Sequence, residues 1–397
     1  MKYNFNEVVN RYGTSSLKFD FVRERGMPDD VLPMWVADMD FPAPPEVLED
    51  IHSAVSHGIF GYTEAKESYY NAVINWFKSR FGNDLVGQGS TCFAYEVTRR
   101  EIVKAPGIVF ALAQAIRAFT EAGDAVLIQT PVYYPFYDII RDNDRVLVTN
   151  PLVYSDGMYS IDFTDFERKI IENNVKLFLL CSPHNPVGRV WTKAELKQLN
   201  EICTRHNVIV ISDEIHCDFV WSGHAHTCFG IINKNAVIAT APSKTFNLAG
   251  LQISNLFVKD TDLRRKLKSE INKSGYSQLN TLGIIACESA YTKGAEWLHE
   301  LKVYLEGNIK LVREFVAERL PKVKMTPPQS TYLVWLDFAE YGLSQEELDK
   351  RITDGAKLWL DGGTMFGKEG KGFQRVNIAC PRSVLQDALD RLKGEFS

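Results

Sequence analysis

Two apolar stretches, Val208 to Ile211 and Ala236 to Thr240, constrain the fold of this chain most strongly. Both have the length and β-branched composition of strands, and their unbroken apolar character is typical of parallel sheets covered by helices. Asp213 follows the first stretch and Lys244 follows the second. Ligands of such sheets bind beyond the carboxyl ends of the strands. We therefore expect an acid and an amine on one rim of the same sheet.

The chemistry of this pair indicates a cofactor. A desolvated lysine has a lowered pKa and forms an imine with a carbonyl group. A carboxylate on the same rim can hold a cationic ring nitrogen, so Lys244 with Asp213 provides what a pyridoxal phosphate site requires. The alternative is that Asp213 caps a helix and Lys244 is a solvated loop charge. The remaining segments decide between these interpretations.

Length and charge exclude several classes of protein. The 397 residues exceed one typical core and indicate two subdomains. A net charge of −5 provides no basic surface for nucleic acid or anionic lipid. There is no apolar run of about 18 residues that could span a membrane, and the first residues lack the apolar region of a signal peptide. We expect a cytoplasmic protein.

The seven cysteines are scattered and form no CxxC pair, which is typical of reduced thiols. One histidine- and cysteine-rich segment could be interpreted as a zinc site. However, its first residues follow a strand end, and its HAH sequence lies in a polar turn region. We therefore expect no metal at these residues: His216, Cys217, Asp218, His224, His226 and Cys228.

Other segments place polar or aromatic residues after predicted strands. Gly107 starts a helix that would present free N–H groups to a phosphate, although a simple tight turn is an equal alternative. Tyr133 and Tyr134 follow the strand at 126–128 and could stack on a planar cofactor. Asn185 follows the strand at 177–180 and is either a turn residue or an amide donor to a ligand.

The two ends of the chain add further elements. PMWVADMDFPAPP is too rich in proline for a long helix and is expected to form an extended arm that packs on another surface, either of its own chain or of a partner subunit. A helix is expected from Pro45. A long amphipathic helical stretch is predicted over about 280–320, and Ser344 is predicted to cap a helix. Arg375 lies in an apolar strand, where it needs an anion, which is either a structural acid or a substrate carboxylate.

Six segments together resemble one enzyme family. PVYYPF, SPHNPVG, SDEIH and APSKTFN, in this order, resemble the aminotransferase-like pyridoxal phosphate enzymes of fold type I. PMWVADMDFPAPP and FQRVNIACPR are similar to the cystathionine β-lyase and cystalysin branch, the MalY/PatB-type carbon–sulfur lyases. This resemblance implies an α/β fold with a large domain, whose mainly parallel seven-stranded sheet is flanked by helices, and a smaller α+β domain. The expected divisions are an arm at 1–45, a large domain at 46–285 and a small domain at 286–397.

The resemblance also implies roles for individual residues. Lys244 would form the Schiff base with pyridoxal 5′-phosphate, Asp213 would pair with its pyridine nitrogen, and Asn185 would donate to its phenolic oxygen. Tyr133 would stack on the ring. Arg375 would bind the substrate α-carboxylate through two hydrogen bonds.

The phosphate would be held by the backbone of Gly107, Ile108 and Val109. Tyr62 of the other subunit would reach the same phosphate, so the resemblance implies a homodimer with shared active sites. The side chains that shape the substrate pocket are expected to be Trp35, Phe41, Tyr134 and the loop at Met365 and Phe366.

Three positions depart from the wider aminotransferase pattern. Gln252 stands where many members have an arginine, and Ala241 stands where a hydroxyl residue is frequent. The phosphate charge would then depend more on the helix start, on Ser243 and on Tyr62. His216 replaces a common tyrosine, and it would either hydrogen-bond near the phenolic oxygen of the cofactor or only pack.

The implied reaction is α,β-elimination from cystathionine, cysteine or another S-substituted cysteine, which gives a thiol, pyruvate and ammonia. Lys244 would remove the Cα proton, and Tyr133 or Lys244 would protonate the sulfur. Transamination uses the same residues and is the main alternative. Binding of a regulator protein, as in some members of this branch, is a further alternative from a different class of function.

Overall fold

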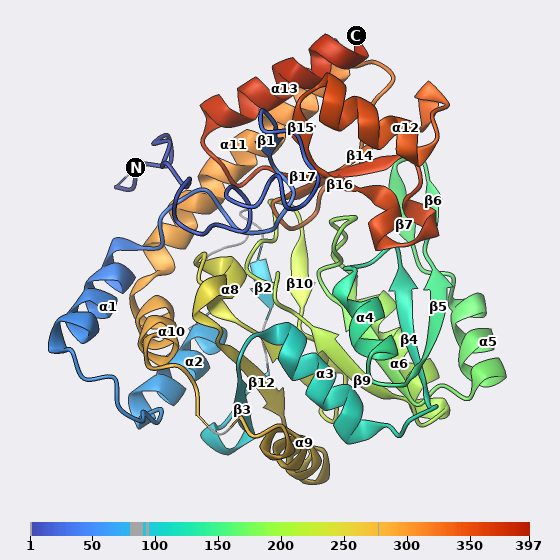
Figure 1. Ribbon diagram of the computed structural model, residues 1–397. Helices are drawn as coiled ribbons and strands as arrows, with labels where there is room; N and C mark the ends of the chain where they lie inside the picture. Colours follow the sequence, from blue (N-terminus) through green and yellow to red (C-terminus); the bar gives the residue numbers. More distant parts are fainter. Residues whose placement is uncertain (1, 80–89, 93–94, 277) are drawn as a thin grey trace.

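The computed structural model describes residues 2–79, 90–92, 95–276 and 278–397. Its centre is a seven-stranded sheet (Figure 1). In spatial order the strands are β3 (Ile102–Ala105), β12 (Ser254–Val258), β11 (Val237–Thr240), β9 (Ile209–Asp213), β8 (Leu177–Cys181), β4 (Ala125–Thr130) and β5 (Val146–Pro151). Strand β12 is antiparallel to both of its neighbours, and the other adjacent pairs are parallel. The predicted mainly parallel seven-stranded sheet is confirmed.

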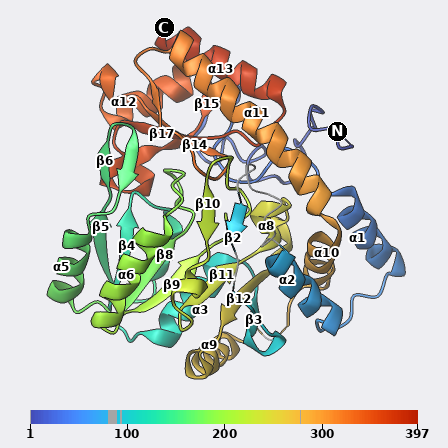
Figure 2. The ribbon, with the colours of Figure 1, turned by 180° about the vertical axis from the view of Figure 1, so that it is seen from behind.

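Both faces of the sheet are buried. In β8, Leu177 and Leu179 belong to the core on one face, while Phe178 and Leu180 belong to the core on the other. Alternate residues of a strand point to opposite faces, so an unbroken apolar run is stable only between two layers of helices. One layer contains α3 (Ile108–Phe119), α4 (Pro135–Arg141) and α9 (Thr261–Lys273), and the other contains α5 (Phe163–Asn173), α6 (Lys193–Arg205) and α7 (Phe229–Ile232) (Figures 1 and 2).

Three helices, α1 (Pro45–His57), α2 (Glu67–Ser79) and α10 (Thr281–Lys293), pack together at one side of the molecule (Figure 1). The first begins at Pro45, as predicted. The helical stretch predicted over about 280–320 is confirmed, but it is divided at Gly294 into α10 and α11 (Ala295–Arg319). A Cβ atom on Gly294 would lie 2.4 Å from the Phe246 ring, so glycine permits this close approach.

A smaller domain contains a second, antiparallel sheet, in the order β13 (Lys324–Met325), β14 (Leu333–Asp337), β17 (Phe373–Asn377) and β16 (Asp361–Gly362). Helices α11, α12 (Gln345–Lys350) and α13 (Arg382–Phe396) accompany it (Figure 1). The predicted capping of α12 by Ser344 is confirmed, because Ser344 forms a capping box with Glu347. The remaining short elements are β6 (Val153–Ser155), β7 (Met158–Ser160), β2 (Ser90–Cys92), β10 (Ala225–Thr227) and α8 (Pro242–Thr245).

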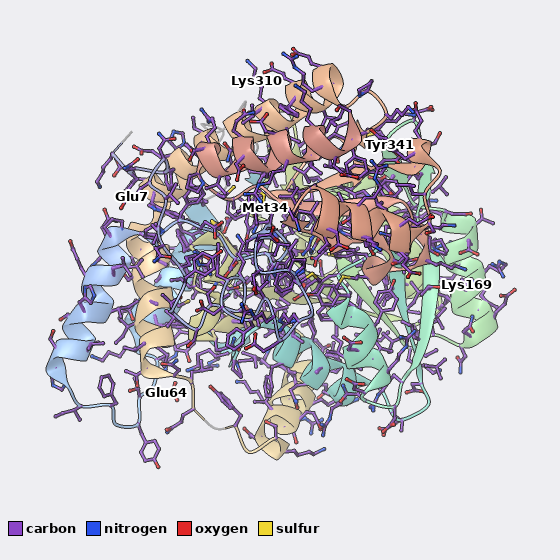
Figure 3. The ribbon with its side chains drawn as sticks, turned by 45° about the horizontal axis from the view of Figure 1, so that its top comes forward. Glu7, Met34, Glu64, Lys169, Lys310 and Tyr341 are labelled. Atoms are coloured by element: carbon purple, nitrogen blue, oxygen red, sulfur yellow. The ribbon has the colours of Figure 1, made fainter. Side chains whose placement is uncertain are left out.

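The N-terminal arm is extended and packs on the smaller domain of its own chain. Strand β1 (Leu32–Pro33) pairs with β15 (Leu358–Trp359). Met34 follows β1, is 1% exposed and lies near the centre of the molecule in Figure 3. Within the described ranges, no helix is both long and apolar enough to cross a membrane.

The carboxyl ends of β3, β4, β8, β9 and β11 lie along one rim of the large sheet. The loops that follow them carry Gly107, Tyr133, Asn185, His216 and Lys244. The smaller domain and the N-terminal arm meet this rim, since Arg375 of β17 contacts Asn185 and the carbonyl of Ala37 contacts Lys244. The fold therefore brings five distant segments to one place.

Candidate active site

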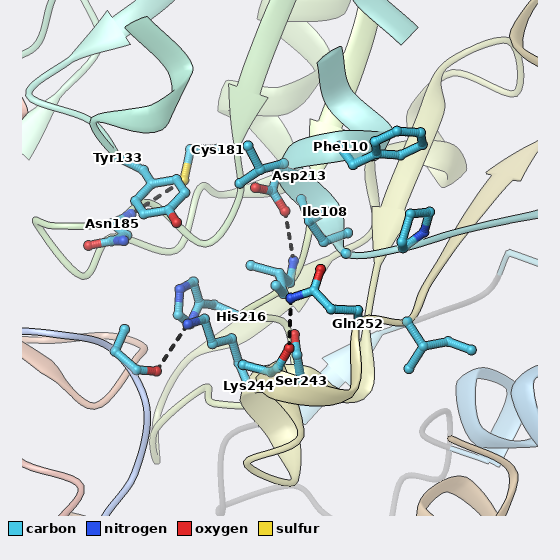
Figure 4. A pocket seen from close by; sticks show the side chains of 17 residues that line it. Ile108, Phe110, Tyr133, Cys181, Asn185, Asp213, His216, Ser243, Lys244 and Gln252 are labelled. Atoms are coloured by element: carbon cyan, nitrogen blue, oxygen red, sulfur yellow. Dashed lines mark hydrogen bonds between the residues drawn. The ribbon is translucent and has the colours of Figure 1, made fainter. Parts of the chain in front are cut away.

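A pocket of about 230 Å³ opens at this rim (Figure 4). Its walls include the residues that the sequence predicted for cofactor binding, except Tyr62: Gly107, Ile108, Val109, Tyr133, Asn185, Asp213, His216, Ser243 and Lys244. Ala37, Cys181 and Gln252 also line it. The pocket is thus formed mainly by strand ends of the large sheet and by one segment of the N-terminal arm.

Lys244 projects into the pocket from α8, the short helix after β11 (Figure 4). Its Nζ donates a hydrogen bond to the Ala37 carbonyl at 3.0 Å. The pKa of Lys244 is lowered from 10.5 to about 8, chiefly by burial. The Asp38 and Asp213 charges oppose this shift, and the Arg375 cation adds to it. The structure therefore excludes the alternative of a solvated loop charge and gives Lys244 a neutral fraction that ordinary lysines lack.

Asp213 ends β9, the strand beside β11, and is 4% exposed. Its Oδ1 accepts a hydrogen bond from the Ile215 N–H at 3.1 Å. Burial raises the pKa of Asp213 to about 7, and the neighbouring Glu214 carboxylate raises it too, whereas the Ile215 hydrogen bond and Lys244 lower it. A cationic N–H donor bound in the pocket would stabilise the ionised form of this carboxylate.

Asn185 and Arg375 are joined by a hydrogen bond across the two domains. Arg375 Nη1 donates to Asn185 Oδ1 at 3.1 Å, and its Nη2 donates to the Trp35 carbonyl at 3.0 Å. A guanidinium group only donates, so this bond fixes the amide orientation and leaves Asn185 Nδ2 to donate to a ligand. Arg375 also forms a buried ion pair with Asp361. Burial raises the pKa of Asp361, and the Arg375 charge and hydrogen bond oppose this shift only in part. The anion that the sequence required for Arg375 is thus, in this structure, Asp361.

Gly107 precedes the first turn of α3, a place where helix N–H groups can bind an anion. Its φ of +66° lies in the left-handed region, where side chains are disfavoured, and an added Cβ would lie 3.0 Å from Gln252 Oε1. The first-turn N–H groups of a 12-residue helix such as α3 have no partner within the helix. They and the helix dipole favour a phosphate. Of the described residues that line the pocket, Lys244 alone has a cationic side chain, so little else offsets a phosphate charge.

Two aromatic residues face the pocket in neutral forms. Burial, followed by the charges of Lys244 and Arg375, lowers the pKa of His216 to about 3, and its buried Nδ1 has no hydrogen-bond partner in the described part of the chain. Burial raises the pKa of Tyr133, so its phenol remains protonated at neutral pH. The Tyr133 N–H donates to the Asn185 carbonyl at 3.1 Å, which joins two loops of the rim.

Several predicted residues do not line the pocket: Tyr62, Trp35, Tyr134, Arg375, Phe41, Met365 and Phe366. Tyr62 lies between α1 and α2 and is 97% exposed. The Trp35 ring stacks on Trp359 at 4.6 Å, so only its carbonyl reaches Arg375. The Tyr134 ring lies 5.5 Å from the Tyr133 ring. The functional roles of these residues stay predictions.

Several contacts of the site were missed by the sequence reasoning. The Ala37 carbonyl accepts from Lys244 and from the Tyr332 hydroxyl, the latter at 2.9 Å. A backbone carbonyl has no sequence signature. Asp361 did have one, because an acid directly after the buried Trp359 and Leu360 needs a cationic partner.

The histidine- and cysteine-rich segment does not converge on one point. His216 faces the pocket, while His226 Nε2 lies 2.9 Å from Glu214 Oε2 on the other side of the rim. Within the described residues, no group of three or more histidine, cysteine or acidic side chains is placed to hold a metal ion.

Comparison with known proteins identifies the family. A family model described as aminotransferase class I and II matches residues 30–392. The chain is 43% identical to cystathionine β-lyase PatB of Bacillus subtilis over 99% of this chain and 100% of the relative. It is 32% identical to protein MalY of Escherichia coli over 98% of this chain and 97% of that protein.

Solved structures agree with this likeness. Cystalysin from Treponema denticola, which contains pyridoxal 5′-phosphate, has a TM-score of 0.92 and 35% identity, with 99% of this chain and 98% of that chain covered. A pyridoxal phosphate-bound C–S lyase from Staphylococcus hominis has a TM-score of 0.90 and 32% identity, with 100% and 98% covered. The family and fold predicted from six sequence segments are confirmed: the chain belongs to the class I and II aminotransferases of fold type I, in their branch of pyridoxal phosphate-dependent carbon–sulfur β-lyases.

Proposed function

We propose that this enzyme cleaves the Cβ–S bond of S-substituted L-cysteines, including cystathionine, and that with one water it releases a thiol, pyruvate and ammonia. One observation carries the proposal. The amine of Lys244, with its lowered pKa, and the buried carboxylate of Asp213 lie at neighbouring strand ends of one pocket. The likeness to a cystathionine β-lyase over nearly the whole chain supports the carbon–sulfur specificity.

The residues present fit pyridoxal phosphate. Asp213 would accept from the ring N–H, and Asn185 Nδ2 would donate to the phenolic oxygen. The unpartnered Nδ1 of His216 favours a hydrogen bond near this oxygen over a role in packing alone. Tyr133 would cover the ring, and Lys244 would hold the aldehyde carbon.

The phosphate would be bound by the N–H groups of Gly107, Ile108 and Val109 and by the Ser243 hydroxyl. This arrangement agrees with the left-handed conformation of Gly107, which leaves space for an anion beside the Gln252 amide. It also explains how a pocket without an arginine at position 252 can hold a phosphate, since helix N–H groups replace the missing cation.

When bound, pyridoxal phosphate withdraws the electron pair that remains at Cα after its proton is removed. Lys244 acts as the general base for that proton, because an amine with a pKa of about 8 is neutral in part at physiological pH. The electron pair then forms the Cα–Cβ double bond while the sulfur leaves with the Cβ–S electrons. Tyr133, which is a neutral phenol, or the newly protonated Lys244 supplies the proton to that sulfur.

Arg375 binds the α-carboxylate and orients Cα towards Lys244. Its bond to Asn185 connects substrate binding with the amide that we assign to the cofactor. Tyr134 lies beside Tyr133, and the Trp35 carbonyl contacts Arg375, although neither residue lines the pocket. We propose that both limit the space for the S-substituent.

We propose that the enzyme is a homodimer in which Tyr62 reaches the phosphate of the partner. The loop between α1 and α2 supports this assembly, because Ile59 is 73% exposed, Phe60 is 61% exposed and Tyr62 is 97% exposed. Adjacent exposed apolar side chains are typical of a surface that a second chain covers. A cytoplasmic location is supported by Cys181, Cys203, Cys228, Cys287 and Cys380, which are buried and form no disulfide.

The test is to incubate the holoenzyme with L-cystathionine and to measure pyruvate and thiol with and without an added oxo acid. Elimination predicts equal pyruvate in both reactions. Transfer of the amino group to the added oxo acid, without release of pyruvate or thiol, would show that the enzyme is an aminotransferase instead. Lys244→Ala is the control variant, because it should abolish the cofactor colour and turnover but leave intact any contact with a regulator protein through the surface.

A further inference from the structure

Arg375 and Asp361 form a buried ion pair between two strands of the smaller sheet. Both residues are 1% exposed, and they face each other directly in the register of β17 and β16. Side chains opposite each other on adjacent strands point to the same face of the sheet. The carboxylate of Asp361 is therefore fixed by the backbone beside the guanidinium that we assign to the substrate.

The donors of Arg375 are largely engaged. A guanidinium has five N–H donors, and in this structure Asn185 Oδ1 accepts from Nη1 while the Trp35 carbonyl and Asp361 Oδ2 both accept from Nη2. Both Nη2 hydrogens are thus used. The Nε–H is buried and has no partner among the described residues.

This count limits how a second carboxylate can bind. A bidentate carboxylate needs two neighbouring donors, which are either Nη1 and Nη2 or Nε and Nη2. Because each choice includes Nη2, a substrate carboxylate must displace an acceptor there or bind through Nε or Nη1 alone. In either case it approaches a guanidinium whose charge Asp361 already neutralises.

We propose that Asp361 is a specificity-determining residue that competes with the substrate α-carboxylate for Arg375 and so lowers the affinity of the site for that carboxylate. The inference rests on the proposed function, in which Arg375 binds the α-carboxylate. Its physical basis is the repulsion between the Asp361 carboxylate and the substrate carboxylate when both contact one guanidinium in a buried site. Asp361 would thereby reduce the preference of the enzyme for amino acids over the corresponding amines.

Asp361→Asn tests this proposal, because asparagine keeps the size of the side chain and an oxygen acceptor for Nη2 while it removes the charge. The ligands are L-alanine and ethylamine, which differ only by the α-carboxylate and have no leaving group at Cβ. Their dissociation constants for the holoenzyme are measured from the change in cofactor absorbance. We expect the variant to bind alanine about tenfold more tightly than the wild type does, with no change for ethylamine.

Asp337→Asn is the matched control. Asp337 is a buried carboxylate of the same small sheet that accepts from the Tyr154 hydroxyl at 3.2 Å and does not contact Arg375. This control should leave both dissociation constants unchanged. If Asp361→Asn fails to bind cofactor or to fold, Asp361→Ser replaces it, and failure of both variants would overturn the proposal by making the carboxylate a structural requirement.

The remaining outcomes are also decisive. Unchanged or weaker alanine binding in Asp361→Asn would overturn the competition, and weaker binding would mean that Asp361 orients Arg375 instead. If the wild type binds alanine no better than ethylamine, Arg375 does not hold the carboxylate and this part of the proposed function fails. If the wild type prefers alanine but the variant does not increase that preference, only the inference about Asp361 fails.

Discussion

The lowered pKa of Lys244 predicts how fast the cofactor attaches at each pH. Only the neutral amine attacks an aldehyde, so the rate follows the neutral fraction of Lys244. With a pKa of about 8 in place of 10.5, roughly one molecule in ten is neutral at pH 7, compared with roughly one in three thousand for an ordinary lysine. The structure therefore predicts an advantage of about 300-fold in the reactive fraction at neutral pH.

The assay begins with protein from which the cofactor has been removed. Pyridoxal phosphate is added between about pH 6 and pH 10, and the imine absorbance is followed with time. The rate should rise about tenfold per pH unit up to about pH 8 and then level off, whereas the same reaction with N-acetyl-lysine should rise until about pH 10. Ionisation of the cofactor itself cancels in the ratio of the two rates.

Two variants make this experiment specific. Lys244→Ala should show no imine, which excludes reaction at other lysines. Asp38→Asn should move the levelling point to lower pH, because the Asp38 charge raises the pKa of Lys244. A rate for the wild type that keeps rising in parallel with N-acetyl-lysine would refute the reasoning, since the amine would then be solvated.

The other predictions concern the two anion-binding parts of the site and the partner chain. Arg375→Met should lower kcat/KM by an amount equivalent to about 2–4 kcal/mol of transition-state stabilisation. It should also lower the free energy of unfolding by about 3–5 kcal/mol, because Asp361 is left buried without its cation. Adding Asp361→Asn should restore the melting temperature but not the activity, and equal melting temperatures for the single and double variants would contradict this. Gly107→Ala should weaken cofactor binding, measured by equilibrium dialysis, and cost about 1 kcal/mol of stability through its positive φ. An alanine variant that retains cofactor like the wild type would show that the phosphate lies elsewhere. Tyr62→Phe should speed the loss of cofactor on dilution if the hydroxyl reaches the partner's phosphate, and an unchanged rate of loss would remove Tyr62 from the site.

The rim of the sheet was predictable because its determinants are local. Each strand is an apolar run, each run ends at a polar or aromatic residue, and parallel strands bring these ends to the same edge. Asp213, Lys244 and Asn185 could therefore be placed together before any coordinates were known. The lowered pKa of Lys244 followed from the same reasoning, because an amine on the rim of a buried sheet is desolvated.

The partners of Arg375 and the break at Gly294 were not predictable in the same way. Asp361 and Arg375 are 14 residues apart and meet only through the pairing of β16 with β17, which the sequence pattern does not specify. Gly294 lies between the two helices where the Phe246 ring leaves no space for a side chain, and helical periodicity does not record such a contact. Tyr62 is 97% exposed, and the contact that we propose for it with a partner's phosphate lies beyond the periodicity of one sequence.

Two backbone carbonyls of residues 35–37 accept hydrogen bonds from Arg375 and Lys244, and the contact with Lys244 can be released. The Trp35 carbonyl accepts from Arg375, and the Ala37 carbonyl accepts from Lys244. A buried carbonyl that loses its donor costs free energy, so departure of the Lys244 amine towards a ligand would normally be opposed. The Tyr332 hydroxyl also donates to the Ala37 carbonyl, at 2.9 Å, and it remains in place when the amine leaves. Lys244 is therefore held by a bond that can be broken without leaving an unsatisfied acceptor behind, which suits the role that we propose for it between cofactor and substrate.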